Sequence, residues 1–193
     1  MGGVEVRMQP APHPSPPRLE AGDRLTRVEF ERRYALLHDR KAELVDGVVY
    51  MPSPARADHG RFQGLLAVWG GVYQEATPSV EVLTDATVRL DEDNEPQPDV
   101  MLRLTAEHGG RSQVDPDGYV SGPPELTIEV AASSSSYDLH QKKEVYRRSG
   151  CQEYMVVLVH EAEVRWFGLE AGRYEPLVPG ADGLLRSDVF PGL

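Results

Sequence analysis

Three segments of the sequence decide the fold: PDVML at residues 98–102, LTIEV at 126–130 and DLHQKK at 138–143. The first two are short apolar runs, typical of strands, and each carries one carboxylate, Asp99 and Glu129. A charged carboxylate in a buried strand is costly unless it is paired or binds a metal. The third segment predicts the start of a helix that carries lysines. Two carboxylates and a lysine are therefore expected to meet at one point.

The rest of the chain predicts helices and strands around these segments. Asp46-Gly47 lies between two short apolar runs and is a type I′ turn signal, and Thr26 with Glu29 has the spacing of a capping box. We expect a helix at 26–39, a hairpin at 41–50, a helix at 59–75, strands at 80–90, 97–104 and 126–132, a helix from 138 to Gly150, and strands at 153–159, 163–169 and 173–177. This order predicts an α/β fold in which a mixed β-sheet is flanked by helices, in three layers.

Glycines recur in the expected helix at 59–75. Gly60, Gly64, Gly70 and Gly71 each cost ~1 kcal/mol inside a helix relative to alanine. Such a cost is accepted where a helix approaches a sheet or a second subunit closely. We expect one of these two uses, and a homodimer as the assembly.

Length and composition indicate one domain with a tail. The chain has 193 residues, 40% of them hydrophobic, so a sizeable core is expected. Prolines crowd residues 10–17, which predicts a flexible, extended arm over residues 1–22 and a single domain over 23–193. No apolar run approaches the ~18 residues that span a bilayer. No secretory signal opens the chain, so we expect a cytoplasmic protein without a membrane partner.

Charge and cysteine content limit the chemistry. The formal net charge is -11, which counts against tight non-specific binding of DNA, because phosphate contacts dominate such binding. Cys151 is the single cysteine, so an intramolecular disulfide and a thiolate zinc cluster are both excluded. Clustered carboxylates remain, and these are the ligands that a divalent magnesium site requires.

The candidate metal ligands are Asp99 and Glu129, with a lysine beside them to stabilise charge in a transition state. Lys142 and Lys143, on the expected helix, are the candidates. Adjacent helix residues point about 100° apart, so only one of the two is expected to face the site. Glu43, on the first strand of the hairpin, is either an exposed edge carboxylate or a third acidic group of the site.

Short motifs along the chain, in one consistent order, resemble the Uma-type endonuclease family of the PD-(D/E)xK restriction-endonuclease-like superfamily. They are ELVDGVVY (43–50), QPDV (97–100), PELTIEV (124–130) and Asp138-Leu139 with Lys142. The resemblance implies a restriction-endonuclease-like fold and hydrolysis of DNA phosphodiester bonds with Mg²⁺, or with Mn²⁺ in its place. It also implies that the catalytic residues are Glu43, Asp99, Glu129 and Lys142, with Asp99 and Glu129 on the metal.

One position departs from the superfamily pattern. The usual lysine two residues beyond the glutamate is Ala131 here, and the resemblance moves that role to Lys142 on the following helix. His59 matches a frequent histidine of the family without an assigned role. Three functions stay open: a metal-dependent DNA endonuclease, a catalytically inactive nuclease-fold protein with a binding or regulatory role, and a β-rich domain that binds a sugar or small molecule.

Overall fold

The computed structural model describes residues 16–38, 40–132 and 134–193. Most of the arm expected at residues 1–22 lies outside these ranges. The described end of that arm is packed: Leu19 is buried and the amide of Gly22 donates to the carbonyl of Val49. Within the described ranges, no helix is both long enough and apolar enough to cross a membrane.

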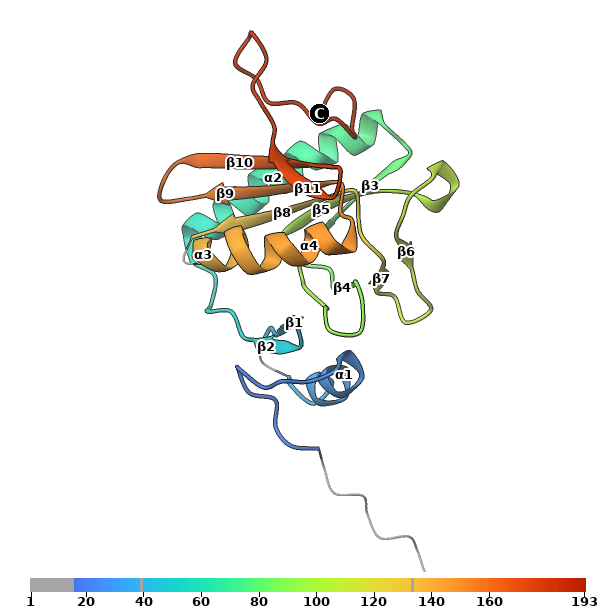
Figure 1. Ribbon diagram of the computed structural model, residues 1–193, viewed down its shortest axis with the longest axis vertical. Coiled ribbons are helices and arrows are strands. Elements are labelled where there is room, and N and C mark those ends of the chain that lie inside the picture. The colour runs from blue at the N-terminus through green and yellow to red at the C-terminus, as the bar shows by residue number, and fades with distance from the viewer. Residues whose placement is uncertain (1–15, 39, 133) are drawn as a thin grey trace, which may run out of the picture.

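A six-stranded sheet forms the centre of the molecule, in the order β11-β10-β9-β8-β5-β3 (Figure 1). Strands β8 and β9 run parallel and the other neighbours run antiparallel, so the mixed sheet predicted from the sequence is confirmed. The strands are β3 (Val80–Thr84), β5 (Val100–Leu104), β8 (Leu126–Ala131), β9 (Glu153–Leu158), β10 (Glu163–Glu170) and β11 (Arg173–Pro176).

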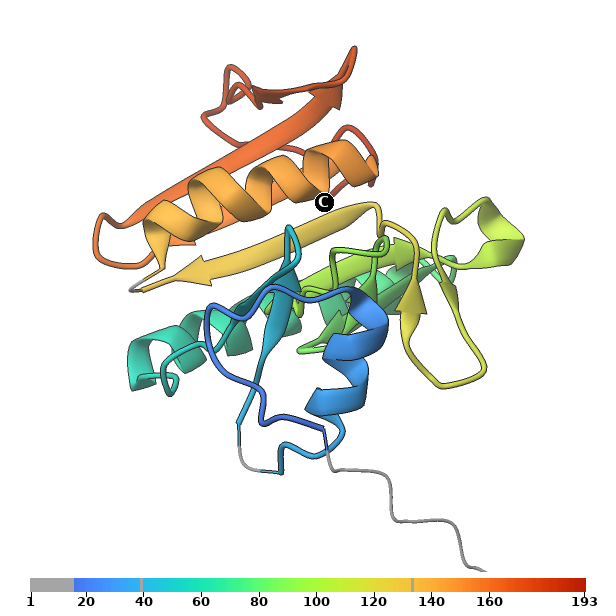
Figure 2. The same ribbon diagram turned by 60° about the horizontal axis from the view of Figure 1, so that its bottom comes forward.

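Helices cover both faces of this sheet (Figure 2). Helix α2 (Ala57–Ala76) covers one face and packs through Phe62, Leu66, Trp69 and Tyr73. Gly70 is the buried glycine of α2, and a Cβ added there would lie 3.2 Å from both methyl groups of Val82. Close approach to the sheet therefore explains Gly70. The other three glycines of this helix face open space.

The opposite face carries a helix built from three consecutive segments. These are α3 (Ser135–Tyr137), the π-helical turn η2 (Asp138–Lys142) and α4 (Lys143–Ser149), and Gly150 ends the helix in a left-handed conformation with φ of 82°. The expected helix start at Asp138 is wrong. Its amide donates to the carbonyl of Ser134, so Asp138 lies inside the helix.

Alternation along β9 explains how one strand serves two cores. Met155 and Val157 belong to the cluster beneath α2, whereas Tyr154 and Val156 belong to the cluster that contains Tyr146 of α4. Successive side chains of a strand point to opposite faces, and here both faces are covered. This accounts for the continuous apolar run of the strand and confirms the three-layer arrangement.

A small N-terminal unit packs beside the sheet. It consists of α1 (Arg27–Tyr34) and the hairpin of β1 (Glu43–Val45) and β2 (Val48–Tyr50). Asp46 and Gly47 have φ of 52° and 69°, as a type I′ turn requires, so the hairpin prediction is confirmed. The capping box is wrong: the Thr26 side chain forms no cap hydrogen bond, and Glu29 pairs with arginines of α1.

The expected strand at 80–90 is interrupted at Asp85, whose φ is 52°. The second half becomes β4 (Val88–Arg89) and joins a separate three-stranded sheet in the order β4-β7-β6. The other two strands of that sheet lie between the expected strands at 97–104 and 126–132. This segment holds η1 (Ala106–His108), β6 (Gln113–Val114) and β7 (Val120–Ser121). The interruption at Asp85 directs the chain from the main sheet toward the N-terminal unit.

Candidate active site

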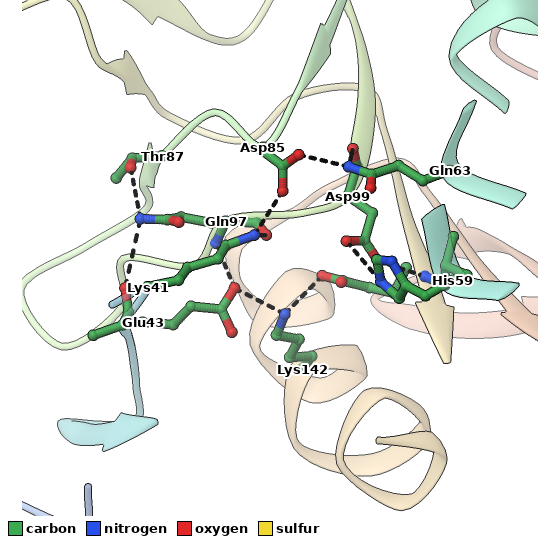
Figure 3. A network of polar contacts seen from close by, with 12 residues as sticks. Lys41, Glu43, His59, Gln63, Asp85, Thr87, Gln97, Asp99 and Lys142 are labelled. Carbon is green, nitrogen blue, oxygen red and sulfur yellow. Dashed lines mark hydrogen bonds and ion pairs between the residues drawn. The ribbon is translucent and has the colours of Figure 1, made fainter. Parts of the chain in front are cut away.

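Lys142 lies at the centre of a buried polar cluster (Figure 3). Its Nζ is 3.0 Å from Oε1 of Glu43 and 3.0 Å from Oε1 of Glu129, and all three side chains are buried. Lys142 is the last residue of the π-helical turn, a local irregularity found frequently at functional sites. Lys143 points elsewhere, with its Nζ 3.4 Å from the centre of the Phe167 ring.

Asp99 and Glu129 are brought together by strand register. Val100 of β5 pairs with Ile128 of β8 in an antiparallel register. Asp99, the residue before Val100, therefore lies opposite Glu129, the residue after Ile128. Directly opposed residues of an antiparallel pair share one face of the sheet. Asp99 also ends the ladder, because its Oδ2 accepts a hydrogen bond of 2.7 Å from the amide of Val130.

His59 holds Asp99 from the opposite direction. Its Nε2 lies 3.2 Å from Oδ2 of Asp99, within reach of a hydrogen bond from the first turn of α2. Burial alone would raise the pKa of Asp99, but the contacts with His59 and with the Val130 amide outweigh burial, so the pKa lies below its ordinary value. Asp99 is therefore held as a carboxylate. The hydrogen bond to Asp99 raises the pKa of His59 in turn.

Glu129 has a different environment. Its Oε1 accepts from Lys142 Nζ and from the Tyr146 hydroxyl at 3.1 Å. Burial raises the pKa of Glu129 well above its ordinary value. Burial would lower the pKa of Lys142, yet the neighbouring carboxylates of Glu129 and Glu43 raise it well above the ordinary value. Lys142 is thus a buried ammonium ion shared by two carboxyl groups.

The hairpin fixes Glu43 in the site. Its Oε1 accepts a hydrogen bond of 2.7 Å from the amide of Gln97, two residues before Asp99. The same glutamine donates from its side chain to Thr87 Oγ1 at 3.0 Å. Glu43 is therefore a buried member of the cluster, and its reading as an exposed edge carboxylate is wrong.

Further polar contacts connect Asp85 with the neighbourhood of this cluster (Figure 3). Lys41 Nζ lies 2.8 Å from Asp85 Oδ1, and Gln63 of α2 donates to Asp85 Oδ2 at 2.6 Å. Gln63 also donates to the carbonyl of Asp99 at 3.2 Å. The irregular Asp85 thus joins α2 and the hairpin strand to the edge where Asp99 lies.

The donor atoms fit a hard divalent cation. Four carboxyl groups lie near enough to affect the pKa of Lys142 or Glu129 through their charge: Glu43, Asp99, Glu129 and Asp138. In the part of the chain that the structure describes, Lys142 is the one buried ammonium ion that faces them. Glu129 Oε2 accepts no hydrogen bond from the described residues. In the described ranges, no group of three or more His, Cys, Asp or Glu side chains is arranged to hold a metal. Mg²⁺ needs fewer protein ligands, because waters and a substrate phosphate complete its shell.

Two contacts of the cluster were not expected from the sequence. Tyr146 carries a detectable signal, since it follows Lys142 by four residues and so shares a helix face with it. For His59 the family resemblance gives no role, and no local spacing predicts its contact, because 40 residues separate it from Asp99 and the packing of α2 joins them. The cluster as a whole combines β1, α2, the start of β5, β8 and the π-helical turn.

Comparison with known proteins is consistent with this geometry. A crystal structure described as "a putative nuclease belonging to DUF820" from Anabaena variabilis is similar, with a TM-score of 0.63 at 16% sequence identity. The match covers 84% of this chain and 94% of that one, and it shows the shared fold. No curated protein matches the chain. The model of the Uma2 family, described as "Putative restriction endonuclease", matches residues 27–193. The chain therefore belongs to the Uma2 family.

Proposed function

We propose that this chain is a Mg²⁺- or Mn²⁺-dependent endonuclease that hydrolyses phosphodiester bonds of DNA. The observation that carries the proposal is the Lys142 ammonium group, held 3.0 Å from both Glu43 and Glu129, with Asp99 opposite Glu129 in the strand register. Carboxylates on adjacent strands beside a lysine are the parts that metal-assisted phosphodiester hydrolysis needs.

Asp99 and Glu129 would hold the cation. A bound divalent ion would polarise phosphoryl oxygens and lower the pKa of a coordinated water. The chain itself orients these ligands: His59 and the Val130 amide hold Asp99 as a carboxylate, and the Tyr146 hydroxyl fixes Oε1 of Glu129. Partners of this kind commonly contribute 10- to 100-fold, by order of magnitude, to metal affinity or activity.

Lys142 would stabilise the negative charge that develops on the phosphate. A fixed ammonium group in a site of low dielectric acts more strongly than the same group in water, and it needs no reorganisation during the reaction. Glu43 positions Lys142 from the side opposite Glu129. In this scheme Glu43 acts through Lys142, whereas Asp99 and Glu129 act through the cation.

A catalytically inactive protein with a binding or regulatory role is the second candidate. The net charge of -11 favours it, since a nuclease must attract a polyanion. The same negative charge also means that the cluster would need a bound cation to offset its repulsion of a phosphate group. The two candidates therefore differ in what the protein does when Mg²⁺ is supplied.

Cleavage of supercoiled plasmid and of single-stranded DNA, with Mg²⁺ or Mn²⁺ and with a chelator as blank, tests the proposal. We expect cleavage by the wild type and its loss in Asp99→Ala and Glu129→Ala. Asp85→Ala is the matched control, because Asp85 contacts the same network from outside the metal pair. Activity that survives in both variants contradicts the mechanism. Absence of cleavage by the folded wild type on both DNAs would favour the binding role.

A further inference from the structure

Helix α2 is apolar on two sides, and only one side is covered. Its inner side packs on the sheet, whereas Leu65, Val68 and Val72 on its outer side are 60%, 66% and 68% exposed. Gly64 and Gly71 lie between them, and a Cβ at either glycine would meet nothing within 4 Å. A surface helix usually turns charged residues to this side. We call these five residues the outer face of α2.

The residues of the outer face are spaced evenly about Val68, and each large residue on one side of Val68 has a glycine at the same distance on the other side. Leu65 lies three residues before Val68 and Gly71 three after it; Gly64 lies four before and Val72 four after. Each bulky side chain thus has a glycine at the mirrored position. At about 100° per residue, Leu65 and Val72 lie on one edge of the outer face, and Gly64 and Gly71 lie on the other. The first edge offers an apolar contact, and the second lets the backbone of another helix approach closely.

The charges at the two ends of the outer face follow the same symmetry. Arg61 lies seven residues before Val68 and Glu75 seven after it. Arg61 is 68% exposed in its side chain and its ion pair with Asp58 is long, at 3.7 Å. Glu75 forms no ion pair with any of the described residues. A positive end and a negative end are therefore available at equal distances from the centre.

We propose that the chain forms a twofold homodimer in which the outer faces of two α2 helices pack antiparallel, with the axis beside Val68. A twofold axis places each residue of one copy at the height of its mirrored position in the other, and it brings the same edge of the two outer faces together. Leu65 then packs beside the partner's Val72, the glycine edges of the two copies approach each other closely, and Arg61 meets the partner's Glu75. The proposal is independent of the nuclease activity.

The antiparallel arrangement is preferred over a parallel one for two physical reasons. A parallel pair would place the edge with Leu65 and Val72 against the partner's glycine edge, so the apolar side chains of the two copies would not pack on one another. It would also set Arg61 against Arg61 and Glu75 against Glu75, and like charges in direct opposition are unfavourable. A mirrored pairing satisfies shape and charge together, which is why the occupant is a second copy of this chain.

Sedimentation equilibrium of the full chain tests the interface. We expect the wild type to be a dimer at micromolar concentration and Val68→Asp to be a monomer with unchanged circular dichroism. Val178→Asp is the matched control, because Val178 is 84% exposed and lies outside α2. A monomeric wild type, or a Val68→Asp variant that stays dimeric, overturns the proposal.

Charge exchange tests the register. Arg61→Glu should weaken the dimer about tenfold, and adding Glu75→Arg should restore it, because the two charges are then exchanged across the axis. A double variant as weak as the single one overturns the register.

Cross-linking separates antiparallel from parallel packing. Oxidised Leu65→Cys alone should stay uncrosslinked, while Leu65→Cys with Val72→Cys should form a covalent dimer. The native Cys151 is buried and does not compete. Cross-linking by the single variant would overturn the antiparallel arrangement.

Discussion

Lys142 Nζ and Glu129 Oε1 lie 3.0 Å apart in the interior, although 13 positions separate the two residues in the sequence. Lys142 is the last residue of the π-helical turn. The wider turn places the lysine over the strand, in contact with the glutamate. Glu43 reaches the same ammonium group from the hairpin, at an equal distance. One lysine therefore connects the N-terminal unit to the central sheet, so its substitution should affect both stability and the proposed activity.

Replacing Lys142 with methionine should abolish DNA cleavage and destabilise the fold. Removing one partner of a buried ion pair typically costs about 3–5 kcal/mol, because the remaining charge is buried without compensation. The measurement is urea unfolding alongside plasmid cleavage. Lys143→Met is the control, since Lys143 packs on Phe167 and should lose under 1 kcal/mol, in the range of a cation–π contact. Equal effects of the two substitutions would disprove the central role of Lys142.

Removing the Tyr146 hydroxyl should alter Glu129 specifically. Tyr146→Phe deletes the hydrogen bond of 3.1 Å to Oε1, which should cost about 1.5–3 kcal/mol and weaken Mn²⁺ binding. Tyr154→Phe is the matched control, because Tyr154 is equally buried but donates to the carbonyl of Asp138. Its loss should lower stability and leave metal affinity unchanged. If metal affinity falls in both variants alike, Tyr146 has no particular role in orienting Glu129.

His59→Ala should reduce cleavage by about 10- to 100-fold, as expected when a group that orients a metal ligand is removed. Asp99 would keep its hydrogen bond from Val130 but lose the contact with His59. Initial cleavage rates at varied Mg²⁺ separate weaker metal binding from a slower reaction. The exposed His140 supplies the control variant, His140→Ala. Unchanged rates in His59→Ala would show that Asp99 does not depend on the histidine.

The sequence predicted the fold best where local pattern and packing agree. The run around Glu129 is a central strand with both faces covered, and the Asp46-Gly47 turn has the expected geometry. Patterning failed at Asp85, because the apolar alternation continues across a residue whose positive φ splits the strand into two sheets. Alternation reports which side chains are buried, but it does not report which partner strand each half meets.

The sequence predicted those residues of the candidate site that lie close together in the chain or belong to a short family motif. Adjacent helix positions diverge in direction, and that rule separates Lys142 from Lys143. The tie between His59 and Asp99 depends on how α2 crosses the sheet, which no local spacing encodes. The expected helix start at Asp138 is wrong because the serines before it are already helical, from Ser135 onward.

Glu95 should make the stability of the fold depend on pH. Burial, together with the hydrogen bond and charge of Glu31, raises the pKa of Glu95 from 4.5 to about 8, against the opposing charges of Arg89 and Arg27. The unfolded chain therefore releases this proton first as pH rises. The contribution of Glu95 to stability is complete below pH 4.5, falls as pH rises, and is lost above about pH 8.

Glu95→Gln removes this titration. The free energy of unfolding of the variant, relative to that of the wild type, should therefore rise by at least about 1 kcal/mol from the acidic to the basic end of that window. Urea unfolding at both ends measures the difference. Glu92→Gln, three residues earlier and 76% exposed in its side chain, is the control. A constant difference between Glu95→Gln and the wild type across the window would refute the buried titration.

The glycines of α2 should respond in opposite ways to alanine. Gly70→Ala places a methyl group 3.2 Å from Val82 and should destabilise the fold by about 1–3 kcal/mol, the usual range for overpacking. Gly60→Ala meets nothing within 4 Å and should stabilise the helix by up to about 1 kcal/mol. Thermal unfolding of both variants checks the contrast. Stabilisation by Gly70→Ala would mean that the helix is not pressed against the sheet there.

The proposed metal site of Asp99 and Glu129 is tested most directly by counting Mn²⁺ bound to the folded protein with electron paramagnetic resonance. Asp99→Asn and Glu129→Gln keep the shape of each side chain, and Asp85→Asn is the control for a neighbouring carboxylate. We predict one bound Mn²⁺ in the wild type and in Asp85→Asn, with affinity at least about tenfold weaker in each of the other two variants. Unchanged Mn²⁺ binding in both Asp99→Asn and Glu129→Gln would contradict a metal held between β5 and β8.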